Sequence, residues 1–115
     1  MQTVLYYENN IMTAQGVDNM KQLELTVDGA VDYLKENLKI HDNLEISYNR
    51  IFAEGEVLNV DFSLYFGEPG FKILMSLDET HLSPTIEIDI YEIQEDLIEF
   101  NHYPRNGEQV EVTVV

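Results

Sequence analysis

The chain has 115 residues, of which 22 are acidic and 6 are basic, and its formal net charge is −16. This charge disfavours direct binding to nucleic acid, which needs Lys and Arg to neutralise phosphates, and it disfavours contact with anionic lipid. The absence of cysteine excludes disulfide bonds, thiol nucleophiles and cysteine-ligated zinc. Seven Tyr and five Phe at an ordinary apolar content indicate a folded protein despite the charge.

The length favours one domain, which we assign to residues 20–115. Residues 1–19 differ from the rest, because a short apolar stretch is followed by polar residues with Asn9-Asn10 and Gly16 as loop signals. We interpret this segment as an N-terminal arm or strand. The chain lacks the basic and apolar regions of a signal peptide and has no run of ~18 apolar residues, so we expect a soluble cytoplasmic protein.

A strand and a helix are the first elements expected after this segment. Apolar and polar residues alternate from residue 23 to residue 27, which predicts a half-buried strand. Asp28 is the expected N-cap of a helix, because a short polar side chain accepts hydrogen bonds from the first helical turn. Val31, Leu34 and Leu38 then recur at helical spacing and predict the buried face of that helix.

Strand patterns dominate the following residues. Residues 44–52 predict a strand that is followed by a turn at Glu54-Gly55. Strict alternation predicts another strand over residues 58–66, and Gly67-Glu68-Pro69-Gly70 predicts a turn. A returning strand over residues 71–77 completes a hairpin.

The C-terminal residues predict two more strands around an ambiguous segment. Residues 86–90 alternate with isoleucine inward and acidic residues outward, and residues 110–114 predict a last strand. From residue 90 to residue 100 the apolar spacing becomes helical, and a continued strand with a bulge is the rival interpretation. The predicted fold class is α+β, an antiparallel sheet of about five strands with one or two helices packed on one face. Beneath the helix we expect a core made of Phe62, Leu64, Ile73, Met75, Ile88 and Val112.

No motif for catalysis or for cofactor binding is present. The chain contains no phosphate-binding glycine loop, no nucleophile elbow, no helical His-Glu-x-x-His and no EF-hand loop. His41, His81 and His102 fall in three separate predicted loops, so we expect them to be ordinary polar residues. The sequence therefore predicts no enzyme, no metal and no cofactor.

The acidic residues are the candidate functional feature. From Leu74 to Pro104 there is no Lys or Arg, although the same window holds eight Asp and Glu. A field of one sign repels nucleic acid and attracts proteins that bind nucleic acid. Tyr91 adds an amphipathic side chain of the type enriched at binding hot spots. The predicted partner-binding residues are Asp78, Glu79, Glu87, Asp89, Tyr91, Glu92, Glu95, Asp96 and Glu99.

In size, charge, lack of cysteine and α+β character, the chain resembles small acidic phage and mobile-element proteins that imitate DNA. These include anti-restriction proteins, anti-CRISPR proteins and inhibitors of uracil-DNA glycosylase. The resemblance implies a stoichiometric inhibitor that blocks the DNA- or RNA-binding groove of a host-defence nuclease such as a CRISPR effector. Two alternatives stay open: an acidic immunity or antitoxin protein that neutralises a basic toxin, and an accessory subunit or small enzyme.

Overall fold

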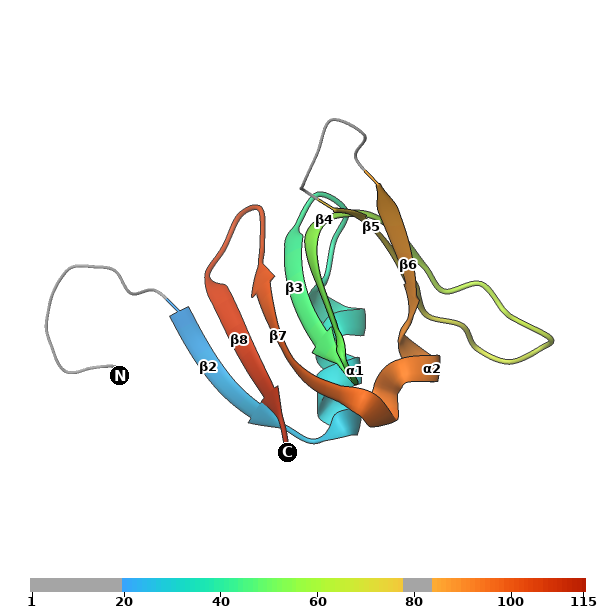
Figure 1. Cartoon of the computed structure of the whole chain (residues 1–115), viewed down its shortest axis with the longest axis horizontal. Helices are drawn as coiled ribbons and strands as arrows, with labels where there is room; N and C mark the ends of the chain where they lie inside the picture. The colour runs from blue at the N-terminus through green and yellow to red at the C-terminus, as the bar shows by residue number, and fades with distance from the viewer. Residues whose placement is uncertain (1–19, 78–83) are drawn as a thin grey trace, which may run out of the picture.

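The computed structural model describes residues 20–77 and 84–115, which build one seven-stranded sheet with two short helices (Figure 1). The predicted arm at residues 1–19 and the side chains of Asp78, Glu79 and His81 lie outside the described residues. Within the described ranges, no helix has the length and apolar character needed to cross a membrane. In chain order the elements are β2 (Met20–Leu25), α1 (Val27–Asn37), β3 (Asn43–Tyr48), β4 (Ile51–Asp61), β5 (Lys72–Leu77), β6 (Thr85–Asp89), α2 (Ile90–Ile93), the 3₁₀ turn η1 (Gln94–Asp96), β7 (Leu97–Tyr103) and β8 (Gln109–Val114).

The α+β class is confirmed, whereas the expected number and direction of the strands need correction. The strands lie in the order β2-β8-β7-β3-β4-β5-β6. Every neighbouring pair is antiparallel except β2 and β8, which are parallel, so the sheet is mixed. Parallel neighbours need a long connection between them. Here all the elements from α1 to β7 lie between β2 and β8 in the chain.

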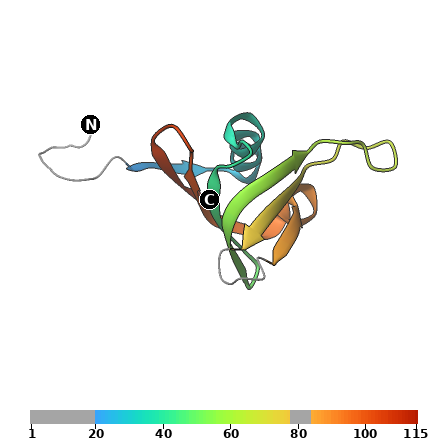
Figure 2. The same cartoon turned by 90° about the horizontal axis from the view of Figure 1, so that it is seen from above.

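Helix α1 packs against one face of the sheet with the side chains that its periodicity predicts (Figure 2). Val31, Leu34 and Leu38 are at most 5% exposed, which confirms the predicted inner face. The N-cap is Thr26 and not Asp28, because the Thr26 hydroxyl accepts a hydrogen bond from the backbone N–H of Gly29 at 3.1 Å. The helix therefore begins at Val27, inside the range expected to be strand.

The segment after α1 contains a hairpin whose turn was expected five residues further on. The turn between β3 and β4 lies at Asn49 and Arg50, and Asn49 has a positive φ of 55°, which asparagine tolerates better than most residues. Gly55 lies in the middle of β4, not in a turn. A Cβ atom at this position would collide with the backbone carbonyl oxygen of Ser76 on β5. Glycine here permits close strand contact.

The β4–β5 hairpin is confirmed, but β4 begins seven residues earlier and ends five residues earlier than the strand expected over residues 58–66. Strand β4 ends at Asp61, and the loop beyond it extends away from the sheet (Figures 1 and 2). Phe62 and Leu64 on this loop are 48% and 70% exposed, so their assignment to the core is wrong. The other four predicted core residues, Ile73, Met75, Ile88 and Val112, are buried. The alternating pattern continues past Asp61, but no strand of the described residues covers this loop, and Phe62 only stacks against Phe71 with ring centroids 5.0 Å apart.

Each of the two interpretations of residues 90–100 is correct for one part of that segment. Asp89 caps the single helical turn α2 by accepting a hydrogen bond from the backbone N–H of Glu92 at 3.2 Å. After η1 the chain becomes β7, whose pairing with β3 shifts register at a bulge beside Tyr48. Leu97 and Phe100 are buried, as either interpretation requires. Strand β7 lies between β3 and β8 and pairs with both, whereas a longer helix would leave the facing edges of β3 and β8 without backbone hydrogen-bond partners.

Candidate functional site: an acidic face of the sheet

The face of the sheet opposite α1 carries rows of polar side chains. Figure 1 looks onto β2, β8, β7 and β3 with α1 behind them, and no helix of the described residues lies in front of these strands. Along each strand, side chains alternate between the two faces. The buried residues of β3, β7 and β8 point toward α1, so the residues between them form the open face.

Two rows of this open face cross five neighbouring strands, β2, β8, β7, β3 and β4. Neighbouring strands are ~4.8 Å apart, so consecutive side chains of a row are close. The first row is Gln22, Glu111, Asn101, Glu45 and Glu54, and the second is Glu24, Thr113, Glu99, Ser47 and Phe52. We call the acidic residues of the two rows the glutamate face: Glu24, Glu45, Glu54, Glu99 and Glu111.

Hydrogen bonds across the strands fix part of the glutamate face. The side-chain amide of Gln22 donates to Glu111 Oε1 at 3.0 Å, and that of Asn101 donates to Glu45 Oε1 at 2.9 Å. The pKa of Tyr103 is raised by burial, by a hydrogen bond to Glu45, and by the negative charges of Glu45, Glu54 and Glu111. These three glutamates therefore act together on one phenol group, and they form a single region of negative potential.

One pair on the glutamate face opposes the ordinary rules of sheet stability. Glu45 and Glu54 lie directly opposite each other on β3 and β4. Like charges in this arrangement destabilise a sheet, whereas a pair of opposite charge would stabilise it. Among the described residues, no Lys or Arg forms an ion pair with Glu24, Glu45, Glu99 or Glu111. These four glutamates thus retain a negative charge that no Lys or Arg of the described residues neutralises through an ion pair.

The predicted partner-binding residues that the structure describes are divided among three regions. Glu99 belongs to the glutamate face. Glu87 and Asp89 lie on β6, the last strand of the sheet, on either side of the buried Ile88. Strands β3, β4 and β5 separate β6 from β7, so residues that are close in sequence are not neighbours in the sheet.

The remaining predicted residues that the structure describes lie on α2 and η1. Glu92, Glu95 and Asp96 are exposed there. Tyr91 is half-buried, with its ring centroid 6.0 Å from that of Phe71 and 5.8 Å from the Lys35 ammonium on α1. Tyr91 therefore contributes to the packing of α2 as well as to the surface.

Four members of the glutamate face were not among the predicted partner-binding residues, namely Glu24, Glu45, Glu54 and Glu111. A local signal was present, because Glu45 lies between the buried Leu44 and Ile46 and is therefore placed on the outer face of a strand. The same pattern surrounds Glu111. The missing information was the strand order, which brings these separate segments together.

His102 departs from expectation, whereas His41 does not. His102 was expected in a loop, but it lies in β7 with only 1% of its surface exposed. His41 lies exposed in the turn between α1 and β3, as expected, and its Nδ1 is 2.8 Å from a carboxylate oxygen of Glu56. In the part of the chain that the structure describes, no group of three or more His, Cys, Asp or Glu residues is arranged to hold a metal ion.

Residues 21–113 match the model of a family described as an uncharacterized protein conserved in archaea (DUF2097), and the chain belongs to this family. No curated protein and no solved structure is significantly similar to it. The family match corrects the resemblance to phage and mobile-element DNA mimics. That resemblance was based on size and charge, which unrelated acidic proteins share.

Proposed function

We propose that this member of an archaeal family is a binding protein whose glutamate face docks onto a basic surface of a partner protein. The observation that carries the proposal is the placement of Glu24, Glu45, Glu99 and Glu111 on neighbouring strands of one open face, where no Lys or Arg of the described residues forms an ion pair with them. Local rules of stability are most often violated where function requires it. A cationic partner would neutralise these carboxylates, and the uncovered face gives it access.

The spacing of the charges favours a partner that binds nucleic acid. Neighbouring strands are ~4.8 Å apart, and alternate residues on one strand are ~6.6 Å apart. Duplex DNA presents one charge per ~1.7 Å of axis over its two strands. A cationic groove arranged for phosphates would therefore find several carboxylates within reach at once. We do not propose a host-defence nuclease as the partner, because that target was inferred from the resemblance that the family match corrects.

Exposed apolar side chains near the glutamate face would add contact area. Phe52, which ends the second row, is 61% exposed, and Ile98, next to Glu99, is 48% exposed. Interfaces commonly combine an apolar centre with a polar rim. We therefore expect the charges to raise the association rate of the partner. We expect Phe52 and Ile98 to increase the lifetime of the complex.

The test compares two double charge reversals that alter the net charge equally. Glu45→Lys with Glu111→Lys changes the glutamate face, and Glu92→Lys with Glu95→Lys changes the exposed acids of α2 and η1. Each immobilised protein is used to capture proteins from an archaeal lysate at low salt, with and without excess duplex DNA. Circular dichroism checks that the variants are folded.

We expect the first variant to lose the DNA-sensitive partner and the second to retain it. Affinity should also fall as salt rises, because ~0.1 M salt screens exposed charges beyond ~10 Å. Equal losses from both variants would show that net charge alone decides binding. Loss from the second variant alone would move the site to the α2 and η1 acids. Capture that tolerates excess DNA would remove nucleic-acid mimicry from the proposal.

A further inference from the structure

The loop between β4 and β5 exposes three consecutive large apolar side chains at its tip. We call residues 62–71 the aromatic loop, and they project from the sheet in both views of the molecule (Figures 1 and 2). Leu64, Tyr65 and Phe66 at the tip are 70%, 59% and 89% exposed. Single apolar side chains are common on a protein surface, whereas an exposed run of three is unusual unless it serves a function.

The tip of the aromatic loop is a tight turn that two hydrogen bonds hold closed. The backbone N–H of Tyr65 donates to the carbonyl oxygen of Glu68 at 2.8 Å, and the N–H of Glu68 donates to the carbonyl oxygen of Tyr65 at 3.0 Å. Between them, Phe66 and Gly67 have positive φ angles of 52° and 80°. Positive φ at both central residues is the mark of a type I′ hairpin turn, so the tip has a defined backbone shape.

Contacts along the aromatic loop connect this turn to the sheet. Phe62 and Phe71 stack across the base of the loop with their ring centroids 5.0 Å apart. The Lys72 ammonium, at the start of β5, lies 4.9 Å from the centroid of the Tyr65 ring. The tip is therefore held in place before a partner arrives, which lowers the entropy cost of binding.

Phe66 has a backbone conformation that does not suit it. The first central position of a type I′ turn favours Asn, Asp or Gly, because positive φ is unfavourable for a bulky side chain. Burial does not offset this cost, since Phe66 is 89% exposed and the Tyr65 ring, 4.6 Å away between centroids, is exposed as well. An unfavourable conformation from which the fold itself gains little points to a functional constraint.

The charge of the aromatic loop indicates what its tip can enter. Glu68 is the one charged residue between Asp61 and Lys72, so the tip suits an apolar and uncharged environment. The rest of the chain brings the net charge to −16, which an anionic lipid surface would repel. A narrow projecting turn also fits a concave site better than a flat one. These features favour a cleft in another protein.

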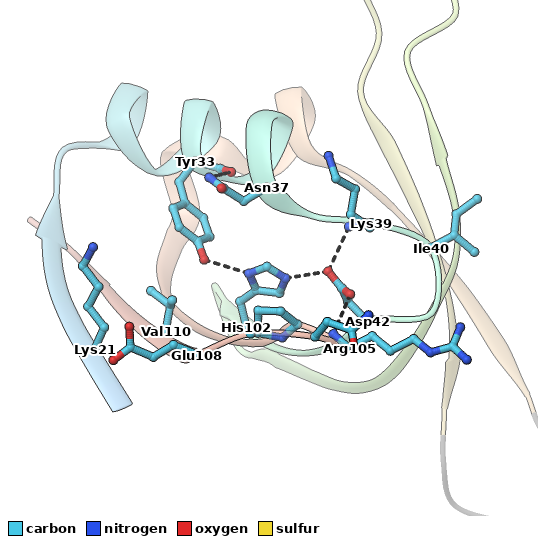
Figure 3. Close-up of a pocket in the computed structure, with 13 residues that line it drawn as sticks. Lys21, Tyr33, Asn37, Lys39, Ile40, Asp42, His102, Arg105, Glu108 and Val110 are labelled. Atoms are coloured by element: carbon cyan, nitrogen blue, oxygen red, sulfur yellow. Dashed lines mark hydrogen bonds and ion pairs between the residues drawn. The ribbon is translucent and has the colours of Figure 1, made fainter. Parts of the chain in front are cut away.

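A second copy of the chain does not offer such a cleft in its pocket beside α1. Charged side chains lie at both ends of this pocket of about 540 Å³, Lys21 at one end and Arg105 at the other (Figure 3). Between them lie the hydrogen-bonded polar groups of Tyr33, His102 and Asp42. This lining does not match an apolar tip, and two chains of net charge −16 repel each other.

We propose that the aromatic loop docks into an apolar cleft of a partner protein, with Phe66 as the anchor and with Leu64 and Tyr65 beside it. A few aromatic anchors in desolvated pockets supply much of the binding energy at protein interfaces. The proposal does not depend on the glutamate face, which reaches β4 at Glu54, whereas the aromatic loop begins at residue 62.

Phe66→Asn separates a role in binding from a role in folding, because Asn followed by Gly is the sequence that a type I′ turn favours. Without a structural role for Phe66, the variant should melt about 4 °C above the native chain. Phe62→Asn makes the same change in a ring that stacks on Phe71 and should lower the melting temperature. A melting temperature of Phe66→Asn below that of the native chain would show that Phe66 stabilises the fold and would overturn the proposal.

Photocrosslinking from the tip tests for the cleft. The full chain with p-benzoyl-phenylalanine in place of Phe66 is irradiated in an archaeal lysate at 0.5 M NaCl, which screens contacts of the glutamate face. Excess native chain should suppress the crosslink, whereas excess Phe66→Asn should not. Mass spectrometry of the adduct should place the crosslink in an apolar segment of the partner. Failure to crosslink any protein, or a crosslink in a highly charged segment, would contradict the proposal.

The purified partner then allows the affinity to be measured by calorimetry. Phe66→Asn should weaken binding by about 30-fold, the size expected for the loss of an anchor residue. Glu45→Lys with Glu111→Lys should change the affinity at 0.5 M NaCl by less than about twofold. Equal losses from Phe66→Asn and from this double variant would show that the aromatic loop is not a separate site.

Two controls distinguish the other occupants of the tip. Vesicles of neutral phosphatidylcholine that bind the native chain but not Phe66→Asn would assign the aromatic loop to lipid. A dimer in sedimentation equilibrium that Phe66→Asn does not form would assign the loop to a second copy. We expect the native chain to be monomeric and not to bind the vesicles, and either of the two opposite results would overturn the proposal.

Discussion

Asp42 combines almost complete burial with three hydrogen bonds, so its replacement should be costly. Asp42→Ala leaves three donors without their acceptor, and we expect a loss of about 3–5 kcal/mol in the free energy of unfolding at pH 7. Asp32→Ala removes the same charge from the exposed side of α1 and should change it by less than about 0.5 kcal/mol. Urea unfolding of both variants measures the difference.

Urea unfolding of the native chain and of Asp42→Ala at low pH checks that the Asp42 carboxylate is the source of the lost stability. Its pKa in the folded protein is lowered from the ordinary value of 3.8. A lowered pKa gives stability that is present above the unfolded value and is lost as pH falls through the folded value. The gap between the native chain and Asp42→Ala should therefore narrow below pH 3.8. A gap that stays constant from pH 7 to pH 3 would contradict this account.

The role of single residues was predictable where it depends on local periodicity. Val31, Leu34 and Leu38 were placed correctly because a helix determines which residues share a face. His102 was placed in a loop because its partners are remote in sequence. Tyr33 and Asp42 are 69 and 60 residues away from it. A buried histidine of this kind leaves no local pattern.

At the scale of the element, the docking of α1 is the feature to test. Leu34 is fully buried beneath the helix, and Glu36 is exposed on its outer side. Leu34→Ala should lower the free energy of unfolding by about 2–5 kcal/mol, through lost burial and the cavity left behind. Glu36→Ala should change it little. Thermal unfolding at moderate salt compares the two, and similar melting temperatures would show that α1 does not pack as described.

Most elements could be predicted from sequence, and the errors occur where pairing decides the outcome. The alternation in residues 44–61 correctly indicated strands, but the turn was placed at Glu54-Gly55 on the presence of a glycine. The backbone of β5 lies so close to position 55 that only glycine fits there. The sequence of β4 alone does not reveal this contact. Residues 97–103 have apolar spacing compatible with a helix, yet they form β7 because β3 and β8 offer partners on both sides.

At the scale of the whole molecule, the order of the strands determines which charges meet. The window without Lys or Arg is continuous in sequence, but it includes both β6 at one edge and β7 in the interior of the sheet. The glutamate face instead draws on five strands that are scattered along the chain. An excess of acid was evident from composition, whereas its concentration on this face required the parallel pairing of β2 with β8 and the insertion of β7.

This distribution of charge predicts that salt stabilises the fold. A net charge of −16 on one small domain favours expansion through self-repulsion, and salt reduces that repulsion. The screening length falls from ~30 Å at 0.01 M to ~10 Å at 0.1 M, so most of the effect should occur in this range. We expect the melting temperature in a phosphate-free buffer to rise by about 5 °C between 0.01 and 0.5 M NaCl, which corresponds to about 1 kcal/mol.

The Glu99→Lys variant locates part of this repulsion on the glutamate face. Glu99 lies on β7, two residues from Asn101. Asn101 pairs with Glu45 on one side and with Glu111 on the other, so a lysine at position 99 has a carboxylate diagonally across each neighbouring strand. Pairs of opposite charge across strands contribute about 0.2–1 kcal/mol. The variant should therefore melt at a higher temperature than the native chain at 0.01 M NaCl, and its gain from added salt should be smaller. Glu92→Lys, on α2, makes the same change in net charge away from the glutamate face. If the two variants gain equally, the repulsion is spread over the whole surface and the glutamate face is not a particular source of strain.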